Sequence, residues 1–297
     1  MAPVLLAVVG PTATGKSAMA IALAERHGGE VVACDSTAVY RGIDIGTDKV
    51  PVHEQRGIPH HLVDMVDATE TYSAARYAAD ASAAIRDIHA RGKVPILAGG
   101  TGFYYRALVR GLFPGPARDE SLRERLNGVA EHRGVESLHR WLARVDPPSA
   151  ERIMPRDQKR LVRALEVYLV TGKPLTAHFA ETSSPLAEFD IRTFGLNVDR
   201  ETLRTRVTAR VEQQFARGVV DEVRRLIEAG VPSTAHAFSG LVYRQIIEMR
   251  AGVRNEAETR ALIVQENMRY ARRQLTWFRH EADVTWIEPG LMPDIHL

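Results

Sequence analysis

A phosphate-binding sequence lies near the start of the chain. Residues 10–17 read Gly-Pro-Thr-Ala-Thr-Gly-Lys-Ser and fit the pattern G-x-x-x-x-G-K-[ST]. Glycines let such a loop curl so that successive backbone N–H groups face an anion, and the following helix adds positive potential. The sequence therefore predicts a polyphosphate cradle, for a nucleotide such as ATP or for a diphosphate. Its members are Gly10, Pro11, Thr12, Ala13, Thr14, Gly15, Lys16 and Ser17, with Lys16 on the terminal phosphates and Ser17 as a ligand of Mg²⁺.

Two further polar side chains follow short apolar runs. Asp35 comes directly after the run 31–34, and Thr101 stands within Gly-Gly-Thr-Gly after the run 94–98. Ligands of open α/β sheets bind at the carboxyl ends of the strands, so both side chains are predicted to lie near the phosphate loop. A carboxylate there could hold Mg²⁺ through water or act as a general base. The alternatives are that Asp35 caps a turn and that Thr101 belongs to a simple turn.

The histidines do not form a convincing metal site. His60 and His61 are adjacent, and neighbouring residues of an extended segment point to opposite faces. Joint ligation with His53 and Cys34 is therefore disfavoured.

The elements that must position these residues alternate between strand and helix. A β-α-β order implies a parallel sheet covered by helices, so we expect a P-loop NTPase-like α/β core. Expected strands are 4–9, 31–34, a possible one at 61–66, 94–98, 191–198 and an edge strand at 284–287. Expected helices of this core are 18–27, 70–91, and long helices near 200–229 and 256–281.

The pattern changes after residue 112. A segment with two prolines, 113–117, is followed by charged helical sequence without strand-like runs. We therefore expect an all-helical domain at 113–190, inserted into a discontinuous core made of 1–112 and 191–297.

Composition limits the class of protein. The chain has 297 residues, of which 45% are hydrophobic and 26% charged, with a formal net charge of +2. These values are typical of a globular protein, and the sequence contains no apolar run of the roughly 20 residues that a membrane helix needs. The single cysteine, Cys34, excludes an internal disulfide framework. We expect a cytoplasmic monomer.

The basic residues are gathered in short segments, although the total charge is nearly zero. Of 39 basic residues only five are Lys, and Arg suits bidentate phosphate contacts. One predicted helix face carries Arg156, Lys159, Arg160 and Arg163; a second segment carries Arg269, Arg272, Arg273 and Arg279; Arg206 and Arg210 form an i, i+4 pair. Ordinary solvated faces and codon bias are the alternatives. Compact arginine clusters on a neutral protein fit a folded RNA partner.

Longer stretches connect these features. They are GPTATGKS, DSTAVYRGIDIGTDK from Asp35, GIPHHLVD from Gly57, GGTGFYYRAL from Gly99, DQKRLVRALEVYLVTGKP from Asp157, FARGVVDEVRRL from Phe215 and RYARRQLTWFR from Arg269. Together, and in this order, they resemble the tRNA dimethylallyltransferase family, also called tRNA isopentenyltransferases.

The resemblance implies a reaction and a partner. A dimethylallyl group would pass from dimethylallyl diphosphate to N6 of adenosine 37 of tRNA, with Mg²⁺ assisting the release of diphosphate. Asp35 would be the general base, Thr101 would bond near the reacting groups, and Arg210 would neutralise the diphosphate with Lys16. Residues expected to touch tRNA are Asp35, Ser36, Thr37, Ala38, Thr101, Arg123, Lys159, Arg160, Leu161, Val162, Arg163, Tyr243, Arg244, Arg272 and Arg273.

The target base must leave its stack, so side chains that could receive it also matter. Tyr40, Tyr104 and Tyr105 are candidate stacking surfaces, with core packing as the alternative. Two positions depart from the family pattern: Ala38 stands where many members have Gln, and Val242 stands where the family has Gly before Tyr243. A small-molecule or nucleotide kinase is the alternative function, because the first hundred residues alone permit it.

Overall fold

The computed structural model describes residues 2–113 and 115–295. Pro114, one of the two prolines of the expected linker, lies outside this range. The chain divides into two compact units, Met1–Val109 with Pro185–Leu297 and Arg110–Ser184. The second unit overlaps most of the expected insertion 113–190 and begins and ends slightly earlier.

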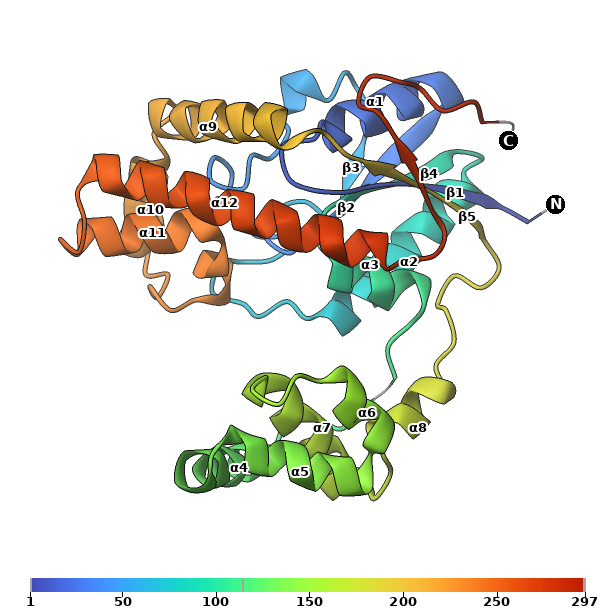
Figure 1. The fold of residues 1–297 in the computed structure, drawn as a ribbon. Helices are drawn as coiled ribbons and strands as arrows, with labels where there is room; N and C mark the ends of the chain where they lie inside the picture. Colours follow the sequence, from blue (N-terminus) through green and yellow to red (C-terminus); the bar gives the residue numbers. More distant parts are fainter. Residues whose placement is uncertain (1, 114, 296–297) are drawn as a thin grey trace. The chain divides into compact units, whose positions relative to one another are not determined.

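The first unit is built on one sheet of parallel strands (Figure 1). This order of strands and helices confirms the α/β class that the alternating pattern predicted. Every connection between consecutive strands is a crossover, as parallel pairing requires, and all but the one that leads to His60 contain at least one α-helix. Across the sheet the order is β3 (His60–His61), β2 (Gly29–Cys34), β4 (Val94–Gly99), β1 (Val4–Val9), β5 (Asp190–Leu196) and β6 (Val284–Ile287).

Helices cover both faces of this sheet. Side chains of β1 alternate, so Leu6 and Val8 pack on α1 (Lys16–His27) while Leu5 and Ala7 point to the other face. Figure 1 shows α1 on one side of the sheet and α2 (Ala74–Ala90) with α3 (Gly102–Val109) on the other. All of β1 after its first residue is buried, which explains its uninterrupted apolar sequence.

Two elements expected in the N-terminal part of the first unit are shorter in the structure. Helix α2 begins at Ala74, not at residue 70, because Ser73 caps it by accepting a hydrogen bond from the Arg76 N–H. The possible strand 61–66 is limited to β3, with Val66 forming only an isolated bridge to Tyr40. A short 3₁₀ helix, η1 (Val52–Glu54), precedes β3.

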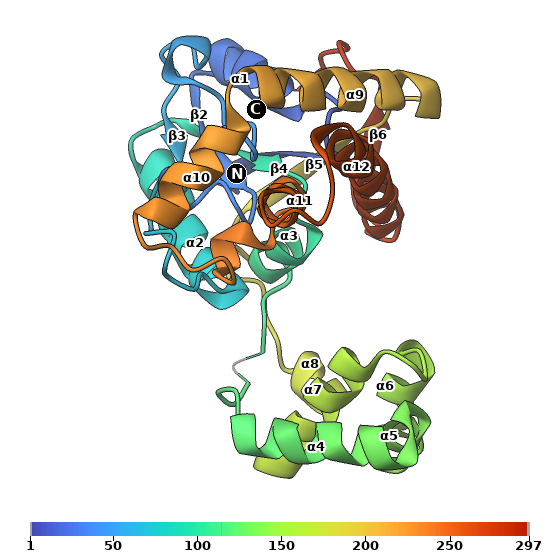
Figure 2. The ribbon, with the colours of Figure 1, turned by 90° about the vertical axis from the view of Figure 1, so that its left-hand side faces the viewer.

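The C-terminal part adds a helical layer beside the sheet (Figure 2). The expected 200–229 region forms two helices, because Gly218 adopts a φ of +87° between them. A helix at 241–250, which the sequence analysis did not identify, packs against the last long helix. The elements are α9 (Arg200–Ala216), α10 (Val219–Glu228), η2 (His236–Ser239), α11 (Leu241–Arg250) and α12 (Glu256–Arg279).

The described residues of the second unit form helices and connecting loops and no strand. Its core includes Leu161 and Val162, both buried, together with apolar residues of the neighbouring helices. The side chains of these two residues therefore pack inside the unit, and the prediction that they touch tRNA is wrong for their side chains. The helices are α4 (Glu120–Arg133), α5 (Val135–Val145), α6 (Pro147–Arg152), α7 (Gln158–Thr171) and α8 (Leu175–Ala180).

A buried carboxylate organises part of the helical unit. Glu166 is fully buried. Its Oε1 accepts a hydrogen bond from Arg123 Nε (2.8 Å), and its Oε2 accepts from Arg123 Nη2 (2.9 Å) and Arg163 Nη1 (2.7 Å). Both arginines were predicted to touch tRNA, and here each stabilises the fold. Arg156 precedes α7 and pairs with Glu136, so the predicted single helix face does not include it.

Candidate active site

Three strands end at the same level and bring distant residues together. In the sheet register Gly99 pairs with Val9 on one side and with Cys34 on the other. The next residues are Gly10, Asp35 and Gly100, so the phosphate loop, the carboxylate and the Gly-Gly-Thr-Gly turn leave one edge of the sheet together. This is the juxtaposition that the sequence predicted from the order of strands.

The phosphate loop needs its two glycines for different reasons. Gly15 has a φ of +94°, a conformation that favours glycine, directly before the first residue of α1. At Gly10 (φ +133°) a Cβ atom would lie 2.5 Å from the carbonyl oxygen of Leu196 on β5, so no side chain fits. Within the loop the Thr14 hydroxyl donates to the Pro11 carbonyl over 2.9 Å, and Lys16 Nζ donates to the same oxygen. The loop is thus a closed turn at the N-terminus of α1.

Arg210 reaches the loop from α9. Its Nη1 donates to Thr12 Oγ1 over 2.8 Å, while its other nitrogens bond Asp48 Oδ2 (3.2 Å) and the Thr47 carbonyl (3.3 Å). Burial and the neighbouring Arg210 charge lower the pKa of Lys16 to about 8. The structure therefore brings together Lys16 and Arg210, the two cationic side chains that the family resemblance assigned to the diphosphate.

Asp35 uses one oxygen to fix the turn that follows it. Its Oδ1 accepts from the Thr37 N–H (2.8 Å), the Thr37 hydroxyl (2.7 Å) and the Ala38 N–H (3.3 Å). Asp35 therefore does cap a turn, as the alternative interpretation held. Within the described part of the chain Oδ2 has no hydrogen-bond partner, which leaves this oxygen for other chemistry.

Thr101 lies beside this turn. Its hydroxyl accepts a hydrogen bond from the Ser36 N–H (3.2 Å), and its own N–H donates to the Cys34 carbonyl (3.2 Å). These bonds join the loops after β2 and β4, so the Asp35 turn and Thr101 hold each other in place.

One cavity of about 550 Å³ contains most of these groups. Lys16, Ser17 and Arg210 line it together with Asp35 and Ala38. Several residues of this cavity were not predicted from the sequence, and they belong to α12 and to the segment after Tyr40. They include Tyr270, Gln274, Thr47, Asp48 and Lys49.

Tyr270 adds an aromatic side chain to the cavity that Asp35 lines. Burial and the Asp35 charge raise the pKa of Tyr270 to about 12, so its hydroxyl stays protonated at neutral pH. It lies within the stretch RYARRQLTWFR, where the basic residues alone had drawn attention. Arg273 lies over its ring, 5.6 Å from the centroid.

The residues present fit Mg²⁺ held jointly with a polyphosphate. Ser17 lines the cavity in the first turn of α1, and no group of three or more His, Cys, Asp or Glu residues within the described ranges could hold a metal by itself. Mg²⁺ is commonly bound by one or two protein oxygens together with substrate phosphates. This arrangement suits Ser17.

The candidate stacking tyrosines are part of the core. Tyr40, Tyr104 and Tyr105 are 0%, 4% and 3% exposed. Tyr104 stacks on Tyr77 with ring centroids 4.3 Å apart. The prediction that they offer a surface to a base is wrong in this structure, because packing already covers their rings.

The remaining predicted RNA contacts divide into exposed and buried groups. Tyr243 is buried and Val242 packs in the same core, so neither side chain faces a partner, whereas Arg244 is exposed. Arg272 and Arg273 are exposed on α12 and have no ion-pair partner among the described residues. In the helical unit the exposed basic side chains of this set are Lys159 and Arg160.

Comparison with known proteins identifies the family to which this chain belongs. Residues 38–281 match the family model described as IPP transferase. The chain belongs to the IPP transferase family. No helix within the described residues is both long and apolar enough to cross a membrane.

Relatives and solved structures extend the match to nearly the whole chain. A tRNA dimethylallyltransferase of Geobacter metallireducens is 48% identical over 98% of this chain and 94% of its own, and one of Solibacter usitatus is 46% identical over 98% and 95%. A full-length tRNA isopentenylpyrophosphate transferase of Bacillus halodurans is similar in structure, with a TM-score of 0.71, 37% identity, and coverage of 96% of this chain and 89% of its own.

A eukaryotic dimethylallyltransferase acting on tRNA is also similar, with a TM-score of 0.81, 28% identity, and coverage of 97% of this chain and 74% of that one. Matches of this extent confirm the resemblance drawn from the sequence stretches. They include the helical unit and α12, which the kinase alternative had left without explanation.

Proposed function

We propose that this chain transfers a dimethylallyl group from dimethylallyl diphosphate to N6 of adenosine 37 of tRNA. The observation that carries the proposal is the cavity in which a diphosphate cradle with two cations, Lys16 and Arg210, faces a carboxylate with an uncommitted oxygen. The relatives' names, which specify dimethylallyl transfer and tRNA, support the same reaction.

The reaction forms one bond and breaks another. The N6 lone pair attacks C1 of the dimethylallyl group, the bond from C1 to the bridging oxygen breaks, and its electron pair leaves with the diphosphate. Lys16, Arg210 and the loop N–H groups stabilise the charge that develops there. Asp35 accepts the N6 proton at Oδ2, since Oδ1 is engaged with Thr37.

Mg²⁺ is the expected cofactor. Ser17 would hold it together with the diphosphate, where it would add positive charge on the leaving group. Tyr270 lines the cavity together with Asp35, and Thr101 bonds the turn that follows Asp35, so their hydroxyl groups can orient the adenine.

The tRNA partner is expected on two surfaces, one in each unit. On the core these are the exposed Arg272 and Arg273, and on the helical unit Lys159 and Arg160. Adenosine 37 would be extruded from its stack to reach the cavity, as enzymes that act on a base require. We also propose that the protein acts in the cytoplasm, where the anticodon loop of tRNA is accessible. We further propose that it is a monomer.

Mass spectrometry of digested tRNA tests the reaction. The purified chain is incubated with Mg²⁺, dimethylallyl diphosphate and tRNA that lacks the modification, and isopentenyladenosine is expected at position 37. A Lys16→Ala variant serves as the matched control. Phosphate transfer from ATP to a small molecule, with no change in the RNA, would overturn the proposal in favour of the kinase.

A further inference from the structure

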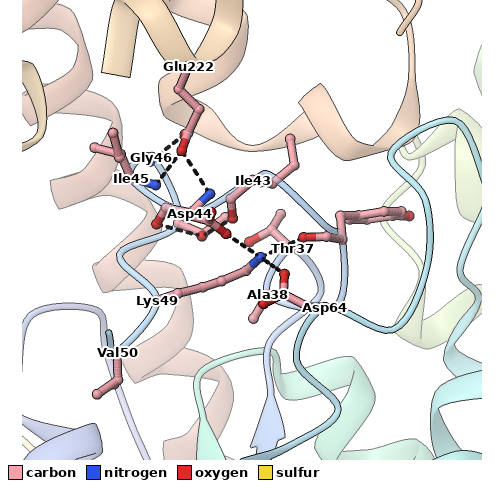
Figure 3. A network of polar contacts seen from close by, with 12 residues as sticks. Thr37, Ala38, Ile43, Asp44, Ile45, Gly46, Lys49, Val50, Asp64 and Glu222 are labelled. Carbon is pink, nitrogen blue, oxygen red and sulfur yellow. Dashed lines mark hydrogen bonds and ion pairs between the residues drawn. The ribbon is translucent and has the colours of Figure 1, made fainter. Parts of the chain in front are cut away.

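A buried carboxylate on α10 binds the backbone turn that directly precedes the cavity-lining residues Thr47 and Asp48. Glu222 is 4% exposed and does not belong to the residues that surround the cavity. Its Oε2 accepts from the N–H groups of Asp44 (3.0 Å) and Ile45 (2.8 Å), and its Oε1 accepts from Gly46 N–H at 3.2 Å (Figure 3). The N–H groups of three successive residues converge on one carboxylate. The same backbone arrangement binds anionic ligands in other proteins, and here the anion is a side chain of the protein itself.

A fourth donor completes the environment of this carboxylate. The Tyr243 hydroxyl donates to Glu222 Oε1 over 2.7 Å. Burial and the Glu222 charge raise the pKa of Tyr243, so the hydroxyl remains a donor. The Tyr243 ring also lies against Gly46, where a Cβ atom would come within 2.5 Å of it, and Gln214 Nε2 donates to the Gly46 carbonyl at 3.2 Å. Glu222 and its neighbours thus hold one turn of backbone tightly.

Lys49 fixes the other end of the same segment. Its side chain is 7% exposed, and Nζ donates to the Tyr40 carbonyl (2.6 Å), Asp44 Oδ1 (2.8 Å) and Asp64 Oδ1 (2.5 Å). Figure 3 shows the Glu222 carboxylate on one side of the turn at residues 44–46 and the Lys49 ammonium group, from the same segment, on the other. The segment 43–49 is therefore anchored twice, once by a carboxylate and once by an ammonium group.

The residues between the two anchors hold the cation at the phosphate loop. The Thr47 carbonyl and Asp48 Oδ2 bond the Arg210 guanidinium, whose Nη1 then reaches Thr12 Oγ1. The Arg210 side chain is long and has several rotatable bonds, so the direction of its guanidinium group depends on its bonds to Thr47 and Asp48. A continuous chain of contacts runs from Glu222 through the segment 43–49 to the diphosphate cradle.

We propose that Glu222 is a positioning residue for Arg210: by fixing the backbone of residues 44–46 it sets Thr47 and Asp48 so that the guanidinium faces the phosphate loop. The proposal rests on the proposed function only for the assignment of Arg210 to the diphosphate. Glu222 does not line the cavity, so its effect on the diphosphate would be indirect.

Binding of inorganic pyrophosphate to the purified full chain with Mg²⁺, measured by calorimetry, tests this without catalysis. Glu222→Gln replaces one acceptor oxygen by an NH₂ group that faces donors, and we expect pyrophosphate affinity to fall about tenfold, equivalent to ~1.4 kcal/mol. In an Arg210→Ala background the same substitution should have little further effect, because contacting residues that act as a unit are not additive. Glu228→Gln, exposed on the same helix, is the matched control.

A milder variant protects the test against misfolding. Tyr243→Phe removes one donor to Glu222 and keeps the ring, so a smaller loss of affinity in the same direction is expected. Equal loss from Glu222→Gln with and without Arg210, or no loss at all, would overturn the positioning role. Pyrophosphate binding that behaves as described in a protein that forms no prenylated tRNA would instead overturn the proposed function and leave the role of Glu222 intact.

Discussion

The side chain of Gln274 on α12 hydrogen-bonds the backbone of Thr12 in the phosphate loop. Its Oε1 accepts from the Thr12 N–H over 2.9 Å, and its Nε2 donates to the Gly100 carbonyl over 2.8 Å. One buried amide therefore joins two loops at the edge of the sheet to a helix near the end of the chain. A Cβ atom at Gly100 would lie 2.3 Å from that Nε2, so the glycine is required for this approach.

Replacing this amide should loosen the diphosphate cradle. Gln274→Leu leaves the Thr12 N–H and the Gly100 carbonyl unpaired, at a cost of about 1–3 kcal/mol for each buried group. We expect a lower urea midpoint and a raised KM for dimethylallyl diphosphate. Gln265→Leu, at an exposed position of the same helix, is the control. Unchanged donor KM in Gln274→Leu would show that the amide is not needed for the loop's shape.

Removing the Asp35 carboxylate should slow the chemical step. Asp35→Ala is expected to lower the single-turnover rate by a factor of ~10²–10⁴, the usual scale for a general base. Affinity for tRNA, measured by filter binding, should change little. Because Oδ1 also caps the turn, Asp35→Asn serves as a second variant that keeps an acceptor for Thr37. Loss of tRNA binding with an unchanged rate would assign Asp35 to recognition.

Diphosphate binding should weaken at alkaline pH. The pKa of Lys16 is lowered to about 8 by burial and by Arg210, so the ammonium form is present below pH 8 and is lost above it. Pyrophosphate affinity should therefore fall as the pH rises through about 8. Arg210→Ala removes one lowering cause and should move this fall to higher pH. An arginine does not titrate in this range, so Lys16→Arg controls for the titration of pyrophosphate itself. The same fall in pyrophosphate affinity in that variant would contradict the assignment of this pH dependence to Lys16.

The arginines of α12 should contribute to tRNA binding through charge. Arg272→Ala with Arg273→Ala is expected to weaken binding and to reduce the slope of log K against log salt by about one per lost phosphate contact. Arg224→Ala, exposed on α10, is the control. A salt slope equal to that of the unsubstituted protein would make these side chains ordinary solvated residues.

The helical unit should lose stability in acid through Glu166. Burial alone would raise its pKa, but hydrogen bonds from Arg123, Arg163 and the Asp119 N–H lower it to about 2. A carboxyl whose pKa is depressed on folding stabilises above its ordinary pKa of 4.5 and loses that contribution as the pH falls toward 2. The loss amounts to about 3 kcal/mol.

Fluorescence of Trp141 can report on this unit. With Trp277 and Trp286 replaced by Phe, urea unfolding followed at Trp141 should show a steep decline in stability between pH 4.5 and pH 3. Adding Glu166→Gln should flatten that decline and lower stability at pH 7. Parallel pH profiles with and without Glu166 would contradict the role given to this carboxylate.

The sequence by itself determined the local chemistry and the order of elements. The phosphate loop, Asp35 and Thr101 could be placed at one sheet edge because each follows a buried run, and parallel strands end at the same edge. Local patterns also located α1, α12 and the helical unit between two halves of the core. The longer stretches identified the family, because their order is specific in a way that a single phosphate loop is not.

Only the tertiary structure decided which side chains reach the site and which are used inside the protein. The structure buries Tyr243, Leu161 and the candidate stacking tyrosines. Neighbouring elements cover these side chains, which removes their apolar area from water. A sequence motif does not reveal which elements will cover a residue. Gln274 and Glu222 act on loops far away in sequence, so no spacing could indicate them. Periodicity reports the face of a helix, whereas the partner of that face is set by how the elements pack.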